Sequence, residues 1–136
     1  VLSGEDILRL QQLVRRVPVA PHLIHFALRI VRATRVLEDD CPDFVKEAIS
    51  WGAGPRGGQN LLLGAKARAV LEGRSYATTE DLRAVAKPVL RHRVITNFNA
   101  DSTGVTSDDI IDRLLNEIPE RSEGDQISPE LVKAFS

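Results

Sequence analysis

Apolar residues recur every three to four positions along most of the chain, which is the spacing of helices that bury one face. Prolines and glycines stand where these periodic segments end. Together the two signals predict five helices, at about residues 3–17, 21–34, 55–72, 78–90 and 106–118. We therefore expect an all-α domain, a small bundle of about five helices with little or no sheet.

Three of these helices begin at capping signals, in which a serine or threonine is followed three residues later by aspartate. The segments are Ser3–Asp6, Thr78–Asp81 and Thr106–Asp109. Pro88 falls inside the fourth helix, where proline removes a backbone hydrogen bond and crowds the preceding turn. We expect a kink there, or a break with a short continuation.

The first two helices each carry an apolar stripe. The stripes are Ile7, Leu10, Leu13, Val14 and Val17 in the first helix, and Leu23, Ala27, Ile30, Val31 and Thr34 in the second. Arg29, Arg32 and Arg35 form a basic stripe beside the second of these. Such a run usually marks a solvated face, and a surface for a neighbouring subunit or a phosphate is the alternative.

The third helix, at about residues 55–72, has apolar groups nearly all round. Its polar positions share one face, and Leu61 and Leu71 fall on that side too. Those polar positions are Asn60, Gly64, Arg68 and Glu72. A helix of this kind belongs in the middle of a bundle, so we expect it to be the most buried. Gly73 is the expected stop.

Two connecting segments are harder to read from periodicity. Phe44–Trp51 fits a short helix or, over Lys46–Trp51, a strand. Val94–Ala100 leads into an expected loop around Asp101–Gly104.

The chain after Pro119 is polar and lacks helical periodicity until Ser128, where a last helical turn or two can begin. We therefore expect a helical domain over residues 1–119. Residues 120–136 are expected to form a linker and a short helical tail.

Composition narrows the class of protein. The 136 residues are 43% hydrophobic and 27% charged, as in one soluble globular domain. The 18 Lys and Arg balance 19 Asp and Glu, which argues against a nucleic-acid or membrane-surface binder. Cys41 is the single cysteine, as expected of a reducing, cytoplasmic compartment. There is no methionine and the chain starts at Val1, so we expect a piece of a longer protein.

A complete active site is missing from the sequence. It contains no phosphate-binding loop of the G-x-x-x-x-G-K-[ST] type, no G-x-G-x-x-G turn and no run long enough to span a membrane. His22 and His25 lack a convincing third zinc ligand. Cys41 has no neighbour in sequence that would lower the pKa of its thiol. We expect neither a bound metal nor ATP turnover from this chain alone.

The segment Trp51–Asn60 stands out, because an arginine follows directly on a proline helix start behind a glycine-rich approach. Arg56 there lies at the positive end of the helix dipole, an unfavourable position for a cation. An external anion would compensate for it. The alternative is a plain loop with Arg56 solvated and Trp51 filling the edge of the core. Arg91–Arg93 is a dense basic cluster that can simply complement a helix C-terminus.

Several motifs resemble the C-terminal lid of MoxR-type AAA+ ATPases, from about the first helix to Pro119. They are Trp51–Arg56, Gly64–Arg74, Thr79–Asp81, Leu90–Arg93 and Thr96–Ala100. The central motif of that group often reads G-A-S-P-R-A. Here Gly54 replaces the serine and Gly57 the alanine, so a looser loop is expected, while Pro55 and Arg56 are kept.

The resemblance implies that a separate α/β core carries the phosphate-binding loop, the magnesium-binding acidic residues and the catalytic water. The lid closes over the nucleotide. The lid's sensor 2 arginine, here Arg56, reaches the γ-phosphate of ATP bound with Mg²⁺, and Gly54, Pro55 and Gly57 form the rest of its nucleotide-binding segment. This chain alone is expected to hold no cofactor.

The resemblance further implies a ring, usually of six subunits, and a chaperone-like role in maturing or remodelling protein complexes. Partners with a von Willebrand factor A domain are common in the family, and the basic stripe becomes a candidate for the ring interface. Two other functions stay open from the residues. One is an autonomous helical protein-interaction module, and the other is a helix-turn-helix DNA binder using Arg91–Arg93, which the charge balance disfavours.

Overall fold

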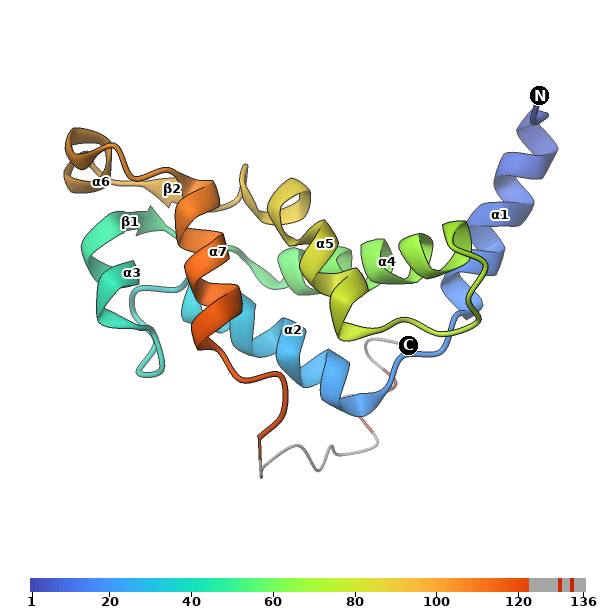
Figure 1. The fold of residues 1–136 in the computed structure, drawn as a ribbon, viewed down its shortest axis with the longest axis horizontal. Helices are drawn as coiled ribbons and strands as arrows, with labels where there is room; N and C mark the ends of the chain where they lie inside the picture. The colour runs from blue at the N-terminus through green and yellow to red at the C-terminus, as the bar shows by residue number, and fades with distance from the viewer. Residues whose placement is uncertain (123–129, 131–132, 134–136) are drawn as a thin grey trace.

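The structure is a computed structural model that describes residues 1–122 together with Glu130 and Lys133. Within this part, seven helices and two short strands follow one another (Figure 1). They are α1 (Gly4–Arg16), α2 (Pro21–Ala33), α3 (Asp43–Ala48), β1 (Ile49–Trp51), α4 (Pro55–Leu71), α5 (Thr79–Leu90), β2 (Ile95–Thr96), α6 (Phe98–Thr103) and α7 (Ser107–Glu117). The predicted all-α class is confirmed, and the five predicted helices are α1, α2, α4, α5 and α7.

The bundle is organised around α4. Helices α5, α2 and α1 pack against it, while α7 packs on α5 and α2. Leu61, Ala65 and Ala69 of α4 are fully buried. The helix is central as predicted, but it is not enclosed all round, because Leu63 is partly exposed and Leu71 is 86% exposed.

The apolar stripe of α2 forms the centre of the core. Its five predicted members are all buried, and Thr34 is as inaccessible as the apolar ones. The neighbouring basic stripe makes contacts within the chain: Arg32 pairs with Glu38 and Asp40. Arg29 donates to the carbonyl oxygens of Pro119 and Glu120. Arg29 and Arg35 are half-buried and Arg32 is exposed, so the stripe is solvated only in part.

Helix α1 forms where its pattern predicts, yet none of its residues is buried. Ile7, Leu10 and Leu13 of the predicted stripe are 47%, 39% and 50% exposed. Figure 1 shows α1 projecting from the body of the molecule beyond the end of α4. Of the five residues of the stripe, Val17 is buried and Val14 is half-buried. Periodicity identifies an apolar face without saying what covers it.

The predicted helix ends are confirmed. Ser3, Thr78 and Thr106 each accept a hydrogen bond from the backbone N–H of the aspartate three residues on, and that aspartate accepts one in return. Gly73 has φ +72°, and Arg74 N–H donates to Ala69 O at 2.8 Å, which closes α4. Helix α5 continues through Pro88 to Leu90, which excludes the break considered above.

The segment Phe44–Trp51, for which a short helix and a strand were the two alternatives, contains both. Helix α3 is followed directly by β1, which pairs antiparallel with β2 so that Ile49 faces Thr96 and Trp51 faces Ile95. Most of the loop expected around Asp101–Gly104 belongs instead to helix α6. The helix begins at the Asn97 side chain, which accepts a hydrogen bond from Ala100 N–H at 3.0 Å. These elements gather at the end of the molecule opposite α1 (Figure 1).

The predicted helical tail from Ser128 lies outside the described residues, apart from Glu130 and Lys133. Among the described residues, no helix combines the length and apolar character needed to cross a membrane.

Candidate functional site

The start of α4 has the form that the sequence predicts. Gly54 is the N-cap residue with extended backbone, and Pro55 opens the first turn. Glycine has no side chain to cap the helix, and Gly57 N–H donates to Gly54 O at 2.9 Å. Pro55 has no backbone N–H, so the N–H groups of Gly54 and Arg56 are the two at this helix start that remain for an anion.

Arg56 follows in that first turn and is exposed. Among the residues that the structure describes, no hydrogen bond or ion pair involves its guanidinium. Arg35, Arg74 and Arg91, by contrast, all pair with carboxylates. A free cation at the positive end of α4 is thus available to bind an anion from outside the domain.

The backbone before Arg56 is held firmly against the end of α2. Ala53 N–H donates to Thr34 Oγ1 at 2.8 Å, and both residues are buried. A Cβ at Gly52 would lie 2.0 Å from Thr34 O, so only glycine fits there. This close approach fixes where the chain enters α4.

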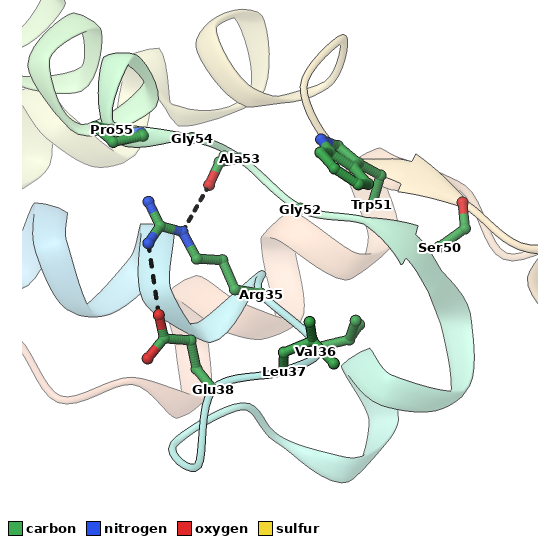
Figure 2. Close-up of a pocket in the computed structure, with 10 residues that line it drawn as sticks. All are labelled: Arg35, Val36, Leu37, Glu38, Ser50, Trp51, Gly52, Ala53, Gly54 and Pro55. Carbon is green, nitrogen blue, oxygen red and sulfur yellow. Dashed lines mark hydrogen bonds and ion pairs between the residues drawn. The ribbon is translucent and has the colours of Figure 1, made fainter.

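Arg35 supports the same segment from the other side. Its Nε donates to Ala53 O at 3.1 Å, and its Nη1 lies 3.5 Å from a carboxylate oxygen of Glu38 (Figure 2). Between the end of α2 and the β1–α4 connection lies an open groove of about 590 Å³. It is lined by Arg35, Val36, Leu37, Glu38, Ser50, Trp51, Gly52, Ala53, Gly54 and Pro55.

Trp51 does not fill the edge of the core. It is 71% exposed, and Leu37, another lining residue of the groove, is 96% exposed. The sequence placed Trp51 and Arg56 in one candidate segment. It assigned Thr34 and Arg35 to the stripes of the second helix and did not single out Leu37, so their place beside that segment is known only from the fold. The one local hint was the glycine directly after Trp51, which permits the close backbone approach.

The two departures from the family motif have different surroundings. Gly54 has open space around its Cα, so a side chain would fit. Gly57 is buried, and a Cβ there would lie 3.2 Å from that of Ala53. The start of α4 is therefore closely packed at Gly57, and what it lacks is a side chain at Gly54 that would cap the helix.

The cluster Arg91–Arg93 serves the fold. Arg91 forms a two-point ion pair with Asp108 of α7, at 3.1 and 2.8 Å. Arg93 donates to Val89 O at 2.6 Å near the end of α5 and contacts the His92 ring. This agrees with the interpretation of these cations as partners of a helix C-terminus.

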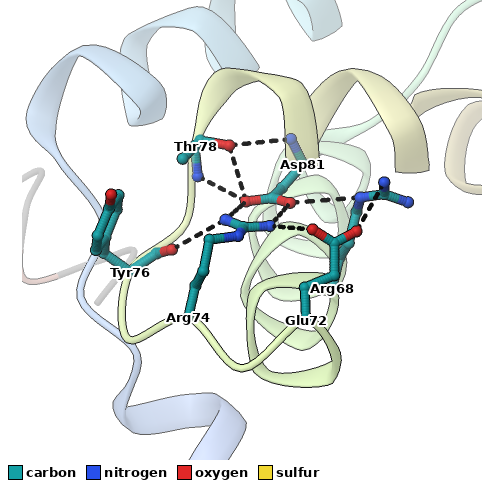
Figure 3. Close-up of polar contacts among 6 residues, drawn as sticks. All are labelled: Arg68, Glu72, Arg74, Tyr76, Thr78 and Asp81. Carbon is teal, nitrogen blue, oxygen red and sulfur yellow. Dashed lines mark hydrogen bonds and ion pairs between the residues drawn. The ribbon is translucent and has the colours of Figure 1, made fainter.

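A second charged cluster joins the end of α4 to the start of α5 (Figure 3). The buried Asp81 carboxylate accepts from Arg74 at 2.6 and 2.7 Å and from Thr78 N–H at 2.8 Å. Glu72 pairs with both Arg68 and Arg74. The Arg74 bonds hold the pKa of Asp81 down at about 2, so the carboxylate is ionised and satisfied. The arrangement is structural.

Other reactive groups offer no site. Cys41 is buried, its thiol donates to Ala33 O at 3.3 Å, and burial raises its pKa, which disfavours the nucleophilic thiolate. The residues described here contain no group of three metal-ligating side chains, so His22 and His25 have no third ligand among them.

The chain is similar to domains of known family. Residues 43–114 match the AAA lid domain. The chain belongs to this family. Over 118 residues it is 31% identical to the chaperone MoxR1 of Mycobacterium tuberculosis. This alignment covers 87% of this chain and 31% of MoxR1. Over 46 residues it is 48% identical to the protein MoxR of Paracoccus denitrificans, covering 34% of this chain and 14% of that protein.

A solved structure shares the fold of this lid domain. The crystal structure of a candidate ATPase from Cytophaga hutchinsonii superposes with a TM-score of 0.81 at 30% identity, covering 87% of this chain and 36% of that one. The resemblance to the lid of MoxR-type AAA+ ATPases is thereby confirmed. The match spans about a third of the length of MoxR1 and of the solved structure, 31% and 36%.

Proposed function

We propose that this chain is the nucleotide-gating lid of a longer MoxR-type ATPase and that Arg56 is its sensor 2 arginine. The single observation that carries the proposal is the position of Arg56: exposed, in the first turn of α4, with no partner among the described residues. The membership of the chain in the AAA lid domain family supports an ATPase core as its companion.

The proposed mechanism is a change of partner for one permanently charged group. In the ATP state the Arg56 guanidinium bonds to γ-phosphate oxygens, and this charge-assisted contact compensates for the cation at a helix start. Hydrolysis and phosphate release remove the contact. The connection between β1 and α4 is bonded to Thr34 and Arg35 at the end of α2, and it packs closely there at Gly52. A displacement of Arg56 therefore moves α4 and α2 together.

The proposal extends to the whole protein. The core would supply the phosphate-binding loop and Mg²⁺, and the assembled protein would form a cytoplasmic ring, of six subunits in the family's usual form. Its work would be chaperone-like maturation or remodelling of protein complexes, with von Willebrand factor A domain proteins as partners. In that setting the backbone of Gly54, Pro55 and Gly57 would position Arg56 toward the nucleotide.

The test is Arg56→Ala in the lid joined to its ATPase core. ATP hydrolysis or nucleotide-dependent assembly is expected to fall at least about tenfold, the loss of one hydrogen-bonded charge contact. Arg16→Ala is the matched control, because Arg16 is also exposed and unpaired within the described residues but lies on α1. Unchanged hydrolysis and assembly in the Arg56 variant would refute the proposal and favour an autonomous interaction module.

A further inference from the structure

Helix α1 carries an apolar face that the rest of the described chain leaves uncovered. Ile7, Leu10 and Leu13 follow one another at intervals of three residues, so they lie within about a third of the helix circumference. Each is between 39% and 50% exposed. Because α1 projects from the body of the molecule, this face is open to a partner (Figure 1).

The charges of α1 are divided between its two ends. Glu5 and Asp6 lie in the first turn, and Arg15 and Arg16 lie in the last. Glu5 and Arg16 are about three turns apart, so they lie on the same side of the helix, about 16 Å from each other along its axis. Within the described residues, Arg16 has no ion-pair partner, and Glu5 has only the exposed contact with Arg9. Both end charges are therefore available to charges of opposite sign on a partner.

A second copy of the same helix, lying antiparallel, matches both features. A two-fold axis near the middle of α1 places Leu10 of one copy beside Leu10 of the other, and Ile7 against Leu13 of the other copy. The same symmetry brings Glu5 of each copy beside Arg16 of the other, because these two residues flank the apolar face on one edge. A parallel pair would instead bring the two acidic ends together and the two basic ends together. The charges therefore select the antiparallel arrangement.

We propose that two copies of this chain associate through their α1 helices, paired antiparallel, with the apolar face at the centre of the contact and Glu5–Arg16 ion pairs at its ends. Such a contact is isologous, whereas neighbours in a cyclic ring meet through heterologous contacts. In the proposed ring protein it would therefore join subunits of two different rings. The pairing is separate from the proposed function, because it needs no nucleotide and Arg56 lies at the end of α4 far from α1.

Analytical ultracentrifugation of the 136-residue chain, from about 10 µM to 1 mM, measures the association. Three half-exposed side chains per copy form a contact smaller than a standard interface, so a weak dimer is expected whose share rises over this range. Leu10→Asp buries a charge at the two-fold axis and is expected to weaken the dimer about tenfold or more.

Leu8→Asp is the matched control for Leu10→Asp. Leu8 is 60% exposed and lies on the opposite side of α1 from Leu10, so the association is expected to stay unchanged. The core cluster of the described residues takes no member from α1, so both variants are expected to keep the fold of the bundle, which circular dichroism would check.

Exchanging the end charges tests the orientation of the two helices. Glu5→Arg and Arg16→Glu are each expected to weaken the dimer about two- to tenfold, because each places like charges at both ends of the contact. Mixed in equal amounts, the two variants carry opposite charges at the facing positions, so the association is expected to recover. A loss of helix stability in either variant would persist in the mixture, and recovery therefore reports the pairing itself.

Four outcomes would count against the pairing. A chain that stays monomeric up to about 1 mM would overturn it. Association that Leu10→Asp leaves unchanged would overturn it too, because another surface would then form the contact. If the mixed charge variants do not recover, the antiparallel arrangement is wrong. In the lid joined to its core, slow hydrogen exchange of the α1 amides in an unpaired protein would assign the apolar face to the core instead.

Discussion

The Thr34 hydroxyl accepts a hydrogen bond from Ala53 N–H at 2.8 Å and donates one to Val31 O at 2.6 Å. Thr34 is completely inaccessible to solvent. One hydroxyl thus joins the end of α2 to the segment that enters α4, across 19 residues of sequence. Together with the Arg35–Ala53 bond, it links the core helix to the proposed nucleotide-facing segment.

Thr34→Val is expected to destabilise the domain by about 1–3 kcal/mol, because the buried Ala53 N–H loses its acceptor while the side-chain volume is kept. Urea unfolding followed by circular dichroism would measure this. Thr103→Val serves as control, since Thr103 bonds to Asn99 O on the exposed helix α6 and should cost well under 1 kcal/mol. Equal stability of the two variants would contradict the role given to Thr34.

Gly52→Ala is expected to cost about 3 kcal/mol or more, because its Cβ would lie 2.0 Å from Thr34 O, a backbone atom that cannot move aside locally. The measurement is the free energy of unfolding of the purified variant. Gly4→Ala is a suitable comparison, since nothing lies within 4 Å of a Cβ there. A Gly52 variant as stable as the parent would show that the close approach is not maintained in solution.

Gly54→Ser is expected to stabilise the domain by about 0.5 kcal/mol, because serine caps a helix start slightly better than glycine and restricts the unfolded chain. The backbone at Gly54, φ −83° and ψ −178°, suits any residue, and the space around it is open. Thermal unfolding would detect the shift. Gly54→Ala restricts the chain without supplying an acceptor, so it should be the less stable of the two; the reverse order would argue against capping.

Asp81→Asn is expected to cost about 2 kcal/mol at neutral pH, since the pKa of this buried carboxyl is lowered from 3.8 to about 2 by Arg74. The folded state favours the ionised form, so the contribution is complete above pH 4 and disappears as pH falls from 4 to 2. Unfolding free energies at several pH values would show a smaller acid-dependent loss in the variant. Asp112→Asn, which breaks only the exposed pair with Lys87, should cost less than 1 kcal/mol.

Features with local causes could be predicted from the sequence. The three capping boxes depend on residues three apart, and Gly73 closes α4 through its own backbone conformation, so both were readable. Helix α6 was also within reach, because Asn97 caps its start and Gly104, with φ +74°, ends it. The prediction for this region was instead a loop around Asp101–Gly104.

Features with long-range causes could not be predicted. The exposure of Trp51 depends on pairing between β1 and β2, which are 44 residues apart at Trp51 and Ile95. The groove depends on Arg35 reaching Ala53, a contact that no spacing in the sequence encodes. The exposed position of Arg56 could be predicted because its surroundings are local, a proline at a helix start followed directly by a cation. Its role toward a nucleotide stays a prediction.

Helix α1 has a consequence for how the chain unfolds. The core cluster of the described residues begins at Val17, so none of its members comes from α1, and Lys66 holds the end of that helix by a bond of its ammonium to Arg15 O at 3.2 Å. A segment attached so lightly can open and close on its own while the remainder stays folded. The α1 amides should therefore exchange with solvent as a separate, weakly protected group. A protein surface that covers Ile7, Leu10 and Leu13 would make α1 unfold together with the rest of the domain, as one cooperative unit.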